Sequence, residues 1–160
     1  MTRDKIPVSV LVVIHTRALD VLLLERADRP GFWQSVTGSR DVEGELLRDT
    51  AIRELKEETG LDADEHVLTD WQKHNEFEIY PHWRHRYAPG ITHNTEHVFG
   101  LTLAQQMPIT IAPREHLQYE WLAWREAAGK VFSWTNREAI LLLPQYASRA
   151  NKSLRRKEAT

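Results

Sequence analysis

The chain has no cysteine, little charge imbalance and no long apolar run. The absence of cysteine among 160 residues excludes disulfides, thiolate nucleophiles and cysteine-ligated zinc, and it fits a reducing compartment. A formal net charge of −2 argues against a nucleic-acid partner held by a large basic surface. The longest apolar run, residues 8–14, is interrupted by Ser9 and is too short to cross a bilayer. We therefore expect a cytoplasmic protein with no membrane partner.

The remaining composition is that of one globular domain. Hydrophobic residues make up 41% of the chain, which at this length is enough for a buried core. From Ala147 onward the residues are small, polar and basic, as is typical of a disordered tail. We predict a single domain over residues 1–148 and a basic tail over residues 149–160.

Several segments rich in β-branched and aromatic residues predict a sheet. A helix is predicted over residues 133–146, near the end of the chain, with Ser133 as its N-cap. The predicted strands cover residues 6–15, 21–25, 32–36, 67–80, 92–103 and 119–124.

Residues 46–59 carry the pattern of an amphipathic helix. Leu47, Ala51 and Leu55 recur every four positions, as they do along the buried stripe of a helix. Gly60 follows the last of this periodic segment, and glycine readily adopts the left-handed conformation that ends a helix. We predict a helix of roughly four turns here.

Three glutamates share another face of this helix. Glu54, Glu57 and Glu58 are spaced i, i+3 and i+4, so their carboxylates converge. Like charges at i, i+4 cost about 0.2–0.5 kcal/mol per pair, and a pair between Arg53 and Glu57 returns only a similar amount. Hard cations such as Mg²⁺ bind carboxylates together with water and substrate phosphates. The alternative is a solvated acidic face, which is the commoner role of glutamate on a helix.

The letters around this helix resemble the Nudix box. The box reads Gly, five residues, Glu, seven residues, Arg-Glu-apolar, one residue, Glu-Glu, one residue, Gly-apolar, and Glu45 stands seven residues before Arg53 as it requires. The six fixed letters from Glu45 to Gly60 match at a given start by chance with a probability on the order of 10⁻⁷. One departure is that six residues separate Gly38 from Glu45. This longer loop leaves open whether the backbone near Thr37 and Gly38 contacts a metal.

Blocks outside the box extend the resemblance over nearly the whole chain. They are WQSVTGS at 33–39, EFEI at 76–79, RHRYAPG at 84–90, NTE at 94–96, EHL at 115–117, SW at 133–134 and NR at 136–137. In this order they resemble the bacterial dihydroneopterin triphosphate pyrophosphohydrolases, a Nudix family of folate biosynthesis. The resemblance implies an α/β fold, an α/β/α sandwich around a mixed β-sheet. It also implies hydrolysis of dihydroneopterin triphosphate to the monophosphate and pyrophosphate.

The same resemblance implies a catalytic metal site. Glu54, Glu57, Glu58 and Glu115 would be the ligands of Mg²⁺, for which Mn²⁺ can substitute, and Arg53 would orient a helix carboxylate. Such a cation neutralises phosphate oxygens and activates a water molecule. Glu115 comes from a segment distant in the sequence and would complete the ligand set or act as a base. Without the resemblance, Glu115 is better explained as an exposed loop acid.

The resemblance also implies a set of substrate contacts. Phe77 and Tyr80 can flank a ring, and a buried acid such as Glu78 can accept hydrogen bonds from the amino and N–H groups of a pterin. Alternate residues of a strand point to opposite faces, so only every second residue of this run would face a pocket. Phe77 and Ile79 can instead belong to the core. The implied contacts are Lys5, Arg26, Thr37, Phe77, Glu78, Ile79, Tyr80 and Ser133.

Residues 81–90 are basic and aromatic. This segment carries two His, two Arg, one Trp and one Tyr, which suits a ligand that combines phosphates with a flat ring. A polar surface loop is the alternative.

Two other functions share the box. A Nudix enzyme that hydrolyses ordinary or oxidised nucleoside triphosphates would use the same helix with a different ring pocket. A ligand-binding module that kept the fold and lost turnover is the other alternative, against which the complete set of acids argues.

Overall fold

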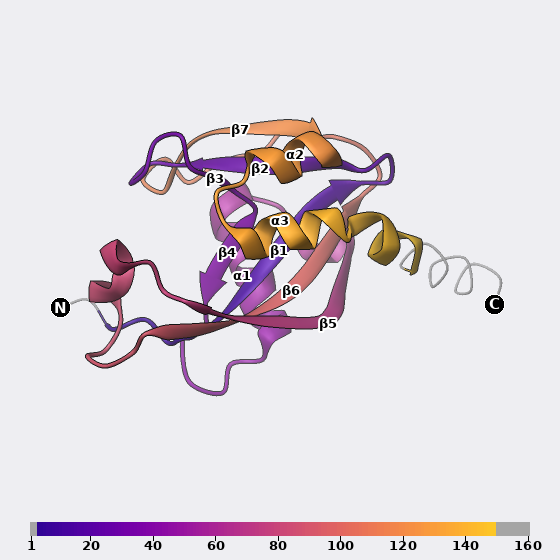
Figure 1. Ribbon diagram of the computed structural model, residues 1–160. Helices are drawn as coiled ribbons and strands as arrows, with labels where there is room; N and C mark the ends of the chain where they lie inside the picture. Colours follow the sequence, from indigo (N-terminus) through magenta and orange to yellow (C-terminus); the bar gives the residue numbers. More distant parts are fainter. Residues whose placement is uncertain (1–2, 150–160) are drawn as a thin grey trace.

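One mixed sheet of seven strands organises the computed structural model, which describes residues 3–149 (Figure 1). The strand order is β3-β2-β1-β6-β5, with β4 also paired to β1 and β7 to β2. β1 and β6 are parallel, whereas the other pairs of named strands are antiparallel. The strands are β1 Val8–Thr16, β2 Asp20–Arg26, β3 Trp33–Gln34, β4 Val36–Ser39, β5 Val67–Glu78, β6 His93–Leu103 and β7 His116–Ala123.

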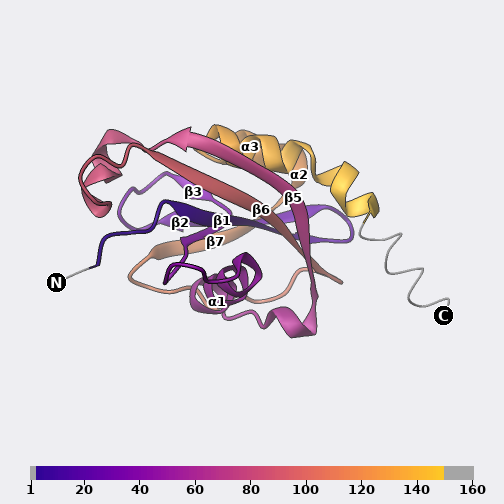
Figure 2. The ribbon, with the colours of Figure 1, turned by 90° about the horizontal axis from the view of Figure 1, so that it is seen from below.

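Helices cover both faces of the sheet (Figure 2). α1 (Leu47–Thr59) packs on one face, and α2 (Trp124–Lys130) and α3 (Trp134–Leu141) pack on the other. Two 3₁₀ turns, η1 (Ala63–Glu65) and η2 (Pro81–Arg86), lie in the connections. The predicted α/β/α sandwich around a mixed sheet is therefore confirmed.

Alternation along β1 divides the core in two. Val10, Val12 and Ile14 pack in the cluster beneath α1, whereas Leu11 and Val13 pack in the cluster beneath α3. Successive side chains of a strand point to opposite faces, so one apolar strand can serve both layers. This double burial explains why the segment reads as a nearly unbroken apolar run.

α1 forms where the sequence predicts it. Ala51 and Leu55 are fully buried against the sheet. The helix ends at Gly60, whose φ of 74° is left-handed and whose N–H donates to the carbonyl of Lys56 at 3.0 Å. This is the C-cap geometry that glycine tolerates at little cost.

The predicted strand over residues 32–36 is wrong as one element. β3 pairs with β2 and β4 pairs with β1, so the segment crosses between two neighbours. Ser35 marks the crossing, because its N–H donates to Asn136 Oδ1 at 2.8 Å instead of to a strand. Asn136 Nδ2 in turn donates to Ser35 Oγ at 3.0 Å, which ties the start of α3 to this corner of the sheet.

Two helical regions also differ from the prediction. α2 was not expected, because only Ala127 and Ala128 are buried on it and such a pair gives little amphipathic signal. The helix predicted over residues 133–146 is interrupted at Leu142, two residues before a proline that cannot donate a helical hydrogen bond. A helical segment over residues 143–149 follows the interruption.

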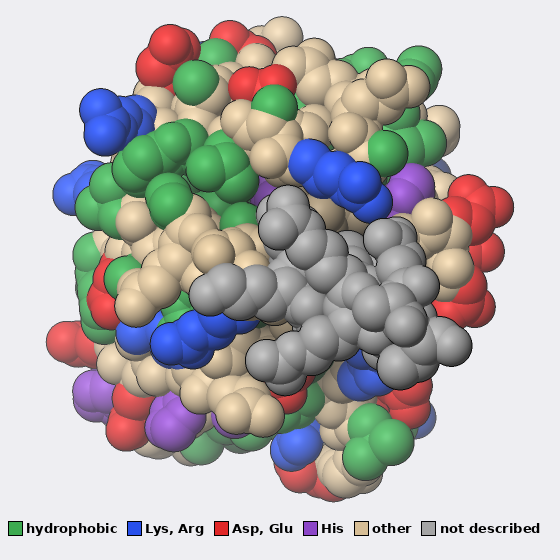
Figure 3. Space-filling model, turned by 90° about the vertical axis from the view of Figure 1, so that its right-hand side faces the viewer, with side chains coloured by type: hydrophobic (Ala, Val, Ile, Leu, Met, Phe, Trp, Pro, Cys, Tyr) green, Lys and Arg blue, Asp and Glu red, His purple; other side chains and the backbone are tan. Residues whose placement is uncertain are grey.

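The described chain remains packed beyond the point where its composition changes. Tyr146 stacks on Trp71 of β5, with ring centroids 4.4 Å apart, and Ala147 is 7% exposed. The start of the predicted tail is therefore helical up to residue 149, and residues 150–160 lie outside the described residues. Figure 3 shows this end of the molecule, where acidic and basic side chains are interspersed. Between residues 3 and 149, none of the helices combines the length and apolar character needed to cross a bilayer.

Candidate active site

Two adjoining pockets form one cleft at an end of the sheet. The acidic pocket is lined by Glu54, Glu57, Glu58, Glu115 and His116, among others. The aromatic pocket is lined by Phe77, Tyr80, Trp83, Phe132 and Trp134, among others. Both pockets are also lined by Lys5, Arg26, Thr37, Gly38 and Arg86.

The three helix glutamates lie side by side but differ in exposure. Glu58 is 3% exposed, whereas the side chains of Glu54 and Glu57 are 13% and 55% exposed. Burial raises the pKa of Glu54 to about 7, and repulsion from Glu57 and Glu115 adds to the shift. Burial also raises the pKa of Glu58 well above its ordinary value, with repulsion from Glu54 and Glu115 adding to the shift. A buried group of like charges is the arrangement that a cation would relieve.

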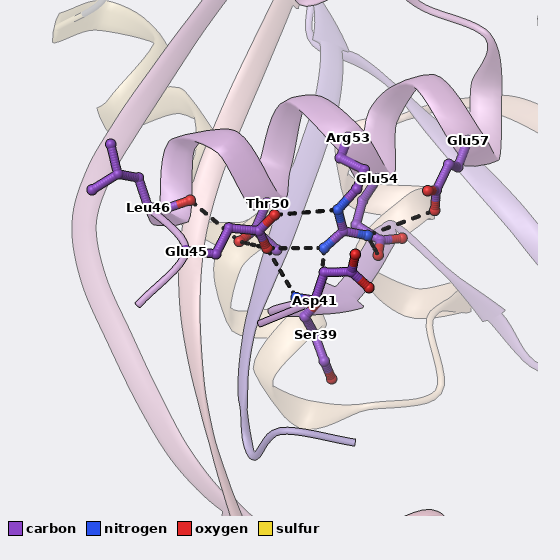
Figure 4. Close-up of polar contacts among 8 residues, drawn as sticks. All are labelled: Ser39, Asp41, Glu45, Leu46, Thr50, Arg53, Glu54 and Glu57. Carbon is purple, nitrogen blue, oxygen red and sulfur yellow. Dashed lines mark hydrogen bonds and ion pairs between the residues drawn. The ribbon is translucent and has the colours of Figure 1, made fainter. Parts of the chain in front are cut away.

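Arg53 joins the helix acids to the preceding loop (Figure 4). One guanidinium nitrogen lies 2.8 Å from Glu54 Oε1, and another lies 3.0 Å from Glu45 Oε1 and donates to the Ser39 carbonyl at 3.0 Å. Glu57 lies further away, at 3.7 Å. Each of the three guanidinium nitrogens of Arg53 therefore has a hydrogen-bond partner in the helix acids or the preceding loop.

The longer loop still delivers Glu45 to Arg53. Glu45 Oε1 accepts hydrogen bonds from the Asp41 N–H at 3.0 Å and the Thr50 hydroxyl at 2.7 Å. Hydrogen bonding to Arg53 is the main reason that the pKa of Glu45 falls to about 2. In the turn before the helix, Gly44 has a left-handed φ of 80°.

Gly38 lies directly against the carboxyl of Glu54. A Cβ placed on Gly38 would lie 2.0 Å from Glu54 Cδ and 2.3 Å from its Oε1. Glycine at this position therefore leaves the space that the Glu54 carboxyl occupies, and any larger residue would displace that carboxyl.

Glu115 and His116 approach the buried end of the acidic pocket from the start of β7. Atoms of Glu58, Glu115 and His116 lie within 4.8 Å of one another, although Glu115 itself is exposed. His116 Nε2 is 3.5 Å from Glu58 Oε1, and Glu58 Oε2 is buried without a hydrogen-bond partner. Burial, reinforced by Arg26, lowers the pKa of His116 to about 4, so its imidazole is neutral at pH 7. A neutral imidazole and two carboxylates are a suitable donor set for a divalent cation.

Aromatic side chains wall the other pocket. Trp83 packs edge-on to Tyr80 at 5.5 Å and to Phe132 at 5.7 Å between centroids. The guanidinium of Arg26 lies 4.4 Å from the centre of the Trp83 ring. Trp134 is 52% exposed at the first turn of α3, so its ring is available to a ligand at the pocket.

All four residues from 77 to 80 line this pocket, both the odd-numbered and the even-numbered ones. β5 ends at Glu78, so strict alternation no longer applies to Ile79 and Tyr80. Ile79 is 3% exposed and Phe77 is half-buried. The competing explanation that Phe77 and Ile79 belong only to the core is therefore too simple.

The expectation of a buried acid at Glu78 is wrong. The side chain of Glu78 is 67% exposed and forms an ion pair with Arg84. Ser133 is used as predicted for a helix start, because its hydroxyl oxygen accepts from the Asn136 N–H at 3.2 Å. That hydroxyl lines the pocket but already has a structural partner.

The loop predicted over residues 81–90 contains the 3₁₀ turn η2, which presents Trp83 to one pocket and Arg86 to both. Sequence reasoning singled out this segment by composition but could not choose among its members. It also gave no role to His116, Asn94 or Glu96, which entered only as members of the blocks EHL and NTE. Asn94 and Glu96 line the inner part of the aromatic pocket.

Comparison with known proteins agrees with this geometry. A family model described as the NUDIX domain matches residues 5–143. The chain is also 49% identical over 144 residues to the dihydroneopterin triphosphate diphosphatase of Escherichia coli K12, covering 86% of this chain and 94% of the relative. The chain belongs to the Nudix family.

Other relatives of this Nudix chain give the same result. It is 44% identical over 135 residues to the dihydroneopterin triphosphate diphosphatase of Haemophilus influenzae, covering 82% of this chain and 84% of the relative. The solved structure of the E. coli dihydroneopterin triphosphate pyrophosphohydrolase matches with a TM-score of 0.80 at 50% identity, over 86% of this chain and 94% of that one. A Caenorhabditis elegans Ap4A hydrolase matches with a TM-score of 0.69 at 18% identity, over 88% and 97%, and so shares the fold.

Proposed function

We propose that this Nudix chain hydrolyses dihydroneopterin triphosphate to dihydroneopterin monophosphate and pyrophosphate, a step of folate biosynthesis, in the cytoplasm. The observation that carries this proposal is a single cleft in which buried acids adjoin an aromatic pocket across a set of basic residues. The two relatives named for this activity, at 49% and 44% identity, supply the choice of substrate.

The acidic pocket fits a divalent cation, which we propose to be Mg²⁺, with Mn²⁺ as a substitute. The fit is supported by Glu58 Oε2, a buried carboxylate oxygen without a partner, next to a second carboxylate and a neutral imidazole. Glu54, Glu57, Glu58 and Glu115 would hold the ion, with His116 beside them. When bound, the cation would offset the charge of the phosphate oxygens and acidify a water molecule.

Basic residues between the pockets would bind the triphosphate. Lys5, Arg26 and Arg86 line both pockets, so a substrate with its ring among the aromatic side chains would pass its phosphates beside them. Burial lowers the pKa of Lys5 to about 8, with Arg86 and Arg26 adding to the effect, so the ammonium remains mostly protonated at neutral pH. These cations would orient the chain of phosphates for attack by water and cleavage that releases pyrophosphate.

Arg53 gives a prediction about positioning. We expect Arg53→Lys to lower kcat about 10–100-fold, as the loss of a residue that orients ligands does. A lysine ammonium is a point charge and cannot reach Glu45, Glu54 and the Ser39 carbonyl together. Pyrophosphate release at saturating substrate measures the effect. Arg48→Lys on the same helix is the control, and equal rates for the two variants would contradict the orienting role.

A second prediction concerns pH and Mg²⁺. Because burial raises the pKa of Glu54 to about 7, this carboxyl must lose a proton before it can bind a cation. We expect the apparent Mg²⁺ affinity to rise roughly tenfold between about pH 6 and pH 8, with net proton release. Titration calorimetry in buffers of different ionisation enthalpy measures both quantities. Glu54→Gln should flatten the dependence, and a wild-type affinity that does not change with pH would contradict it.

The substrate proposal is tested against nucleotides. Purified protein is given dihydroneopterin triphosphate, the ordinary nucleoside triphosphates and 8-oxo-dGTP at equal Mg²⁺, and kcat/KM is compared. The proposal expects a clear preference for the pterin. Equal or better hydrolysis of a nucleotide would replace it with a nucleotide pyrophosphatase, and binding without turnover of any of them would indicate a ligand-binding module.

A further inference from the structure

The inner part of the aromatic pocket holds two buried oxygen atoms without hydrogen-bond partners. They are Glu96 Oε1 and Asn94 Oδ1, and both residues line the pocket. Glu96 is 5% exposed and Asn94 is 3% exposed. Buried polar atoms are nearly always paired, so an unpaired couple at a pocket indicates a ligand that supplies the missing donors.

The strands fix the position of both side chains. Asn94 and Glu96 are two positions apart on β6, so they point to the same face of the sheet. On the parallel strand β1, Ser9 is the register partner of Glu96 and lines the same pocket. Asn94 Nδ2 donates to Ser9 Oγ at 2.7 Å, which leaves the Oδ1 of this amide as the free acceptor.

Among the residues that the structure describes, none donates a hydrogen bond to Glu96 Oε1. Asn75 stands opposite Glu96 on β5, but its Nδ2 also lacks a partner, so the two side chains do not bond. Burial raises the pKa of Glu96 to about 7, and Thr135 of α3 opposes this shift. A pair of donors from a ligand would favour the charged carboxylate in this setting.

The polar and aromatic groups of the pocket indicate which hydrogen-bonding edge a ring ligand would present. Acceptors at the inner end call for adjacent donors on the ligand, and the aromatic walls call for a flat ring. A 2-amino-4-oxopyrimidine edge carries a ring N–H next to an exocyclic amino group, and it occurs in both pterins and guanine. Adenine has no such ring N–H, and hypoxanthine has no such amino group.

We propose that Glu96, with Asn94 beside it, determines the specificity of the cleft by accepting hydrogen bonds from the N–H and amino groups of a 2-amino-4-oxopyrimidine ring. This inference deepens the proposed function and rests on it for the identity of the phosphorylated substrate. It assigns to Glu96 the ring contact that the sequence suggested for Glu78, which is exposed and paired with Arg84.

The test separates ring binding from hydrolysis. Neopterin and guanosine, which carry no phosphates, are titrated calorimetrically into the wild type, Glu96→Gln and Glu76→Gln. Glu76 is the matched control, an exposed acid on β5 that does not line the pocket. We expect Glu96→Gln to weaken binding of the preferred ring about 10²-fold, because the variant places an amide donor against ligand donors. Glu76→Gln should bind as the wild type does.

The change in ring affinity caused by Glu96→Gln decides the test. A loss of about fivefold or more in Glu96→Gln supports the inference, and a smaller loss, or no binding of either ring to the wild type, overturns it. Tighter binding of neopterin assigns the edge to a pterin, and tighter binding of guanosine assigns it to a guanine nucleotide.

Steady-state kinetics provide a second test of the role of Glu96. With dihydroneopterin triphosphate, Glu96→Gln should raise KM about 10²-fold and leave kcat within a few-fold, because the residue lies away from the acidic pocket. A purely structural role would instead lower the melting temperature and leave the preference for GTP over ITP and ATP unchanged. If the wild type hydrolyses the pterin and Glu96→Gln has the same KM, this inference alone is overturned. If Glu96→Gln loses ring binding but the wild type does not hydrolyse the pterin, the proposed function alone is overturned.

Discussion

Replacing Glu58 by Gln should abolish nearly all turnover while the protein remains folded. Glu58 is 3% exposed, and its Oε2 is a buried oxygen without a hydrogen-bond partner among residues 3–149. An amide at this position removes a negative charge from the acidic pocket, and with it one of the proposed ligands of the cation. We expect kcat to fall on the order of 10³-fold, as losing several kcal/mol of electrostatic stabilisation in the transition state does.

The same change should not harm the fold. Burial and repulsion from Glu54 raise the pKa of Glu58 well above its ordinary value, so the charged form is disfavoured in the metal-free protein. A neutral amide of the same size relieves that penalty, and the melting temperature without Mg²⁺ should stay equal or rise. Glu126→Gln, an exposed acid on α2, is the matched control. Turnover of Glu58→Gln at the wild-type rate would remove Glu58 from the reaction.

Gly38→Ala should lower kcat/KM on the order of 10²-fold, the cost of displacing a reacting group by about 1 Å. The added Cβ would lie 2.0 Å from Glu54 Cδ, so one of the two residues has to move. The atoms that it meets are the far end of a flexible side chain, and the fold can yield by turning this carboxyl away. We therefore expect a large loss of activity with little change in melting temperature.

A second glycine provides the control for this variant. A Cβ added to Gly129 on α2 would meet no described atom within 4 Å apart from its chain neighbours and the backbone of its own helix, and alanine is favoured over glycine in a helix by up to about 1 kcal/mol. Gly129→Ala should keep full activity and melt at the same or a higher temperature. If Gly38→Ala also kept full activity, the space that Gly38 leaves for the Glu54 carboxyl would not be needed to position it.

The local sequence pattern was sufficient to predict α1 and the face on which its glutamates lie. Leu47, Ala51 and Leu55 define the buried stripe, and the helical repeat then fixes where Glu54 and Glu58 point. The end at Gly60 follows from the same short stretch. These features depend on neighbours within four residues, which is why one sequence is enough to predict them.

Features made by distant segments were not predictable in this way. The split of residues 32–36 depends on Asn136, which is 101 positions from Ser35. The exposure of Glu78 depends on where β5 ends and on the turn that presents Arg84. The short helix α2 has too few buried residues to leave a periodic signal.

By itself the sequence determined the fold class, the helix with its three glutamates and the family to which the chain belongs, because each depends on local spacing or on letters that the family shares. Only the tertiary structure decided which acids are buried and which oxygen atoms lack partners. Glu58, His116 and Glu96 come from three separate elements, and their burial follows from the packing of α1, β7 and β6 around one cleft. Burial and electrostatic coupling are properties of that packing, and no spacing within a single segment encodes them.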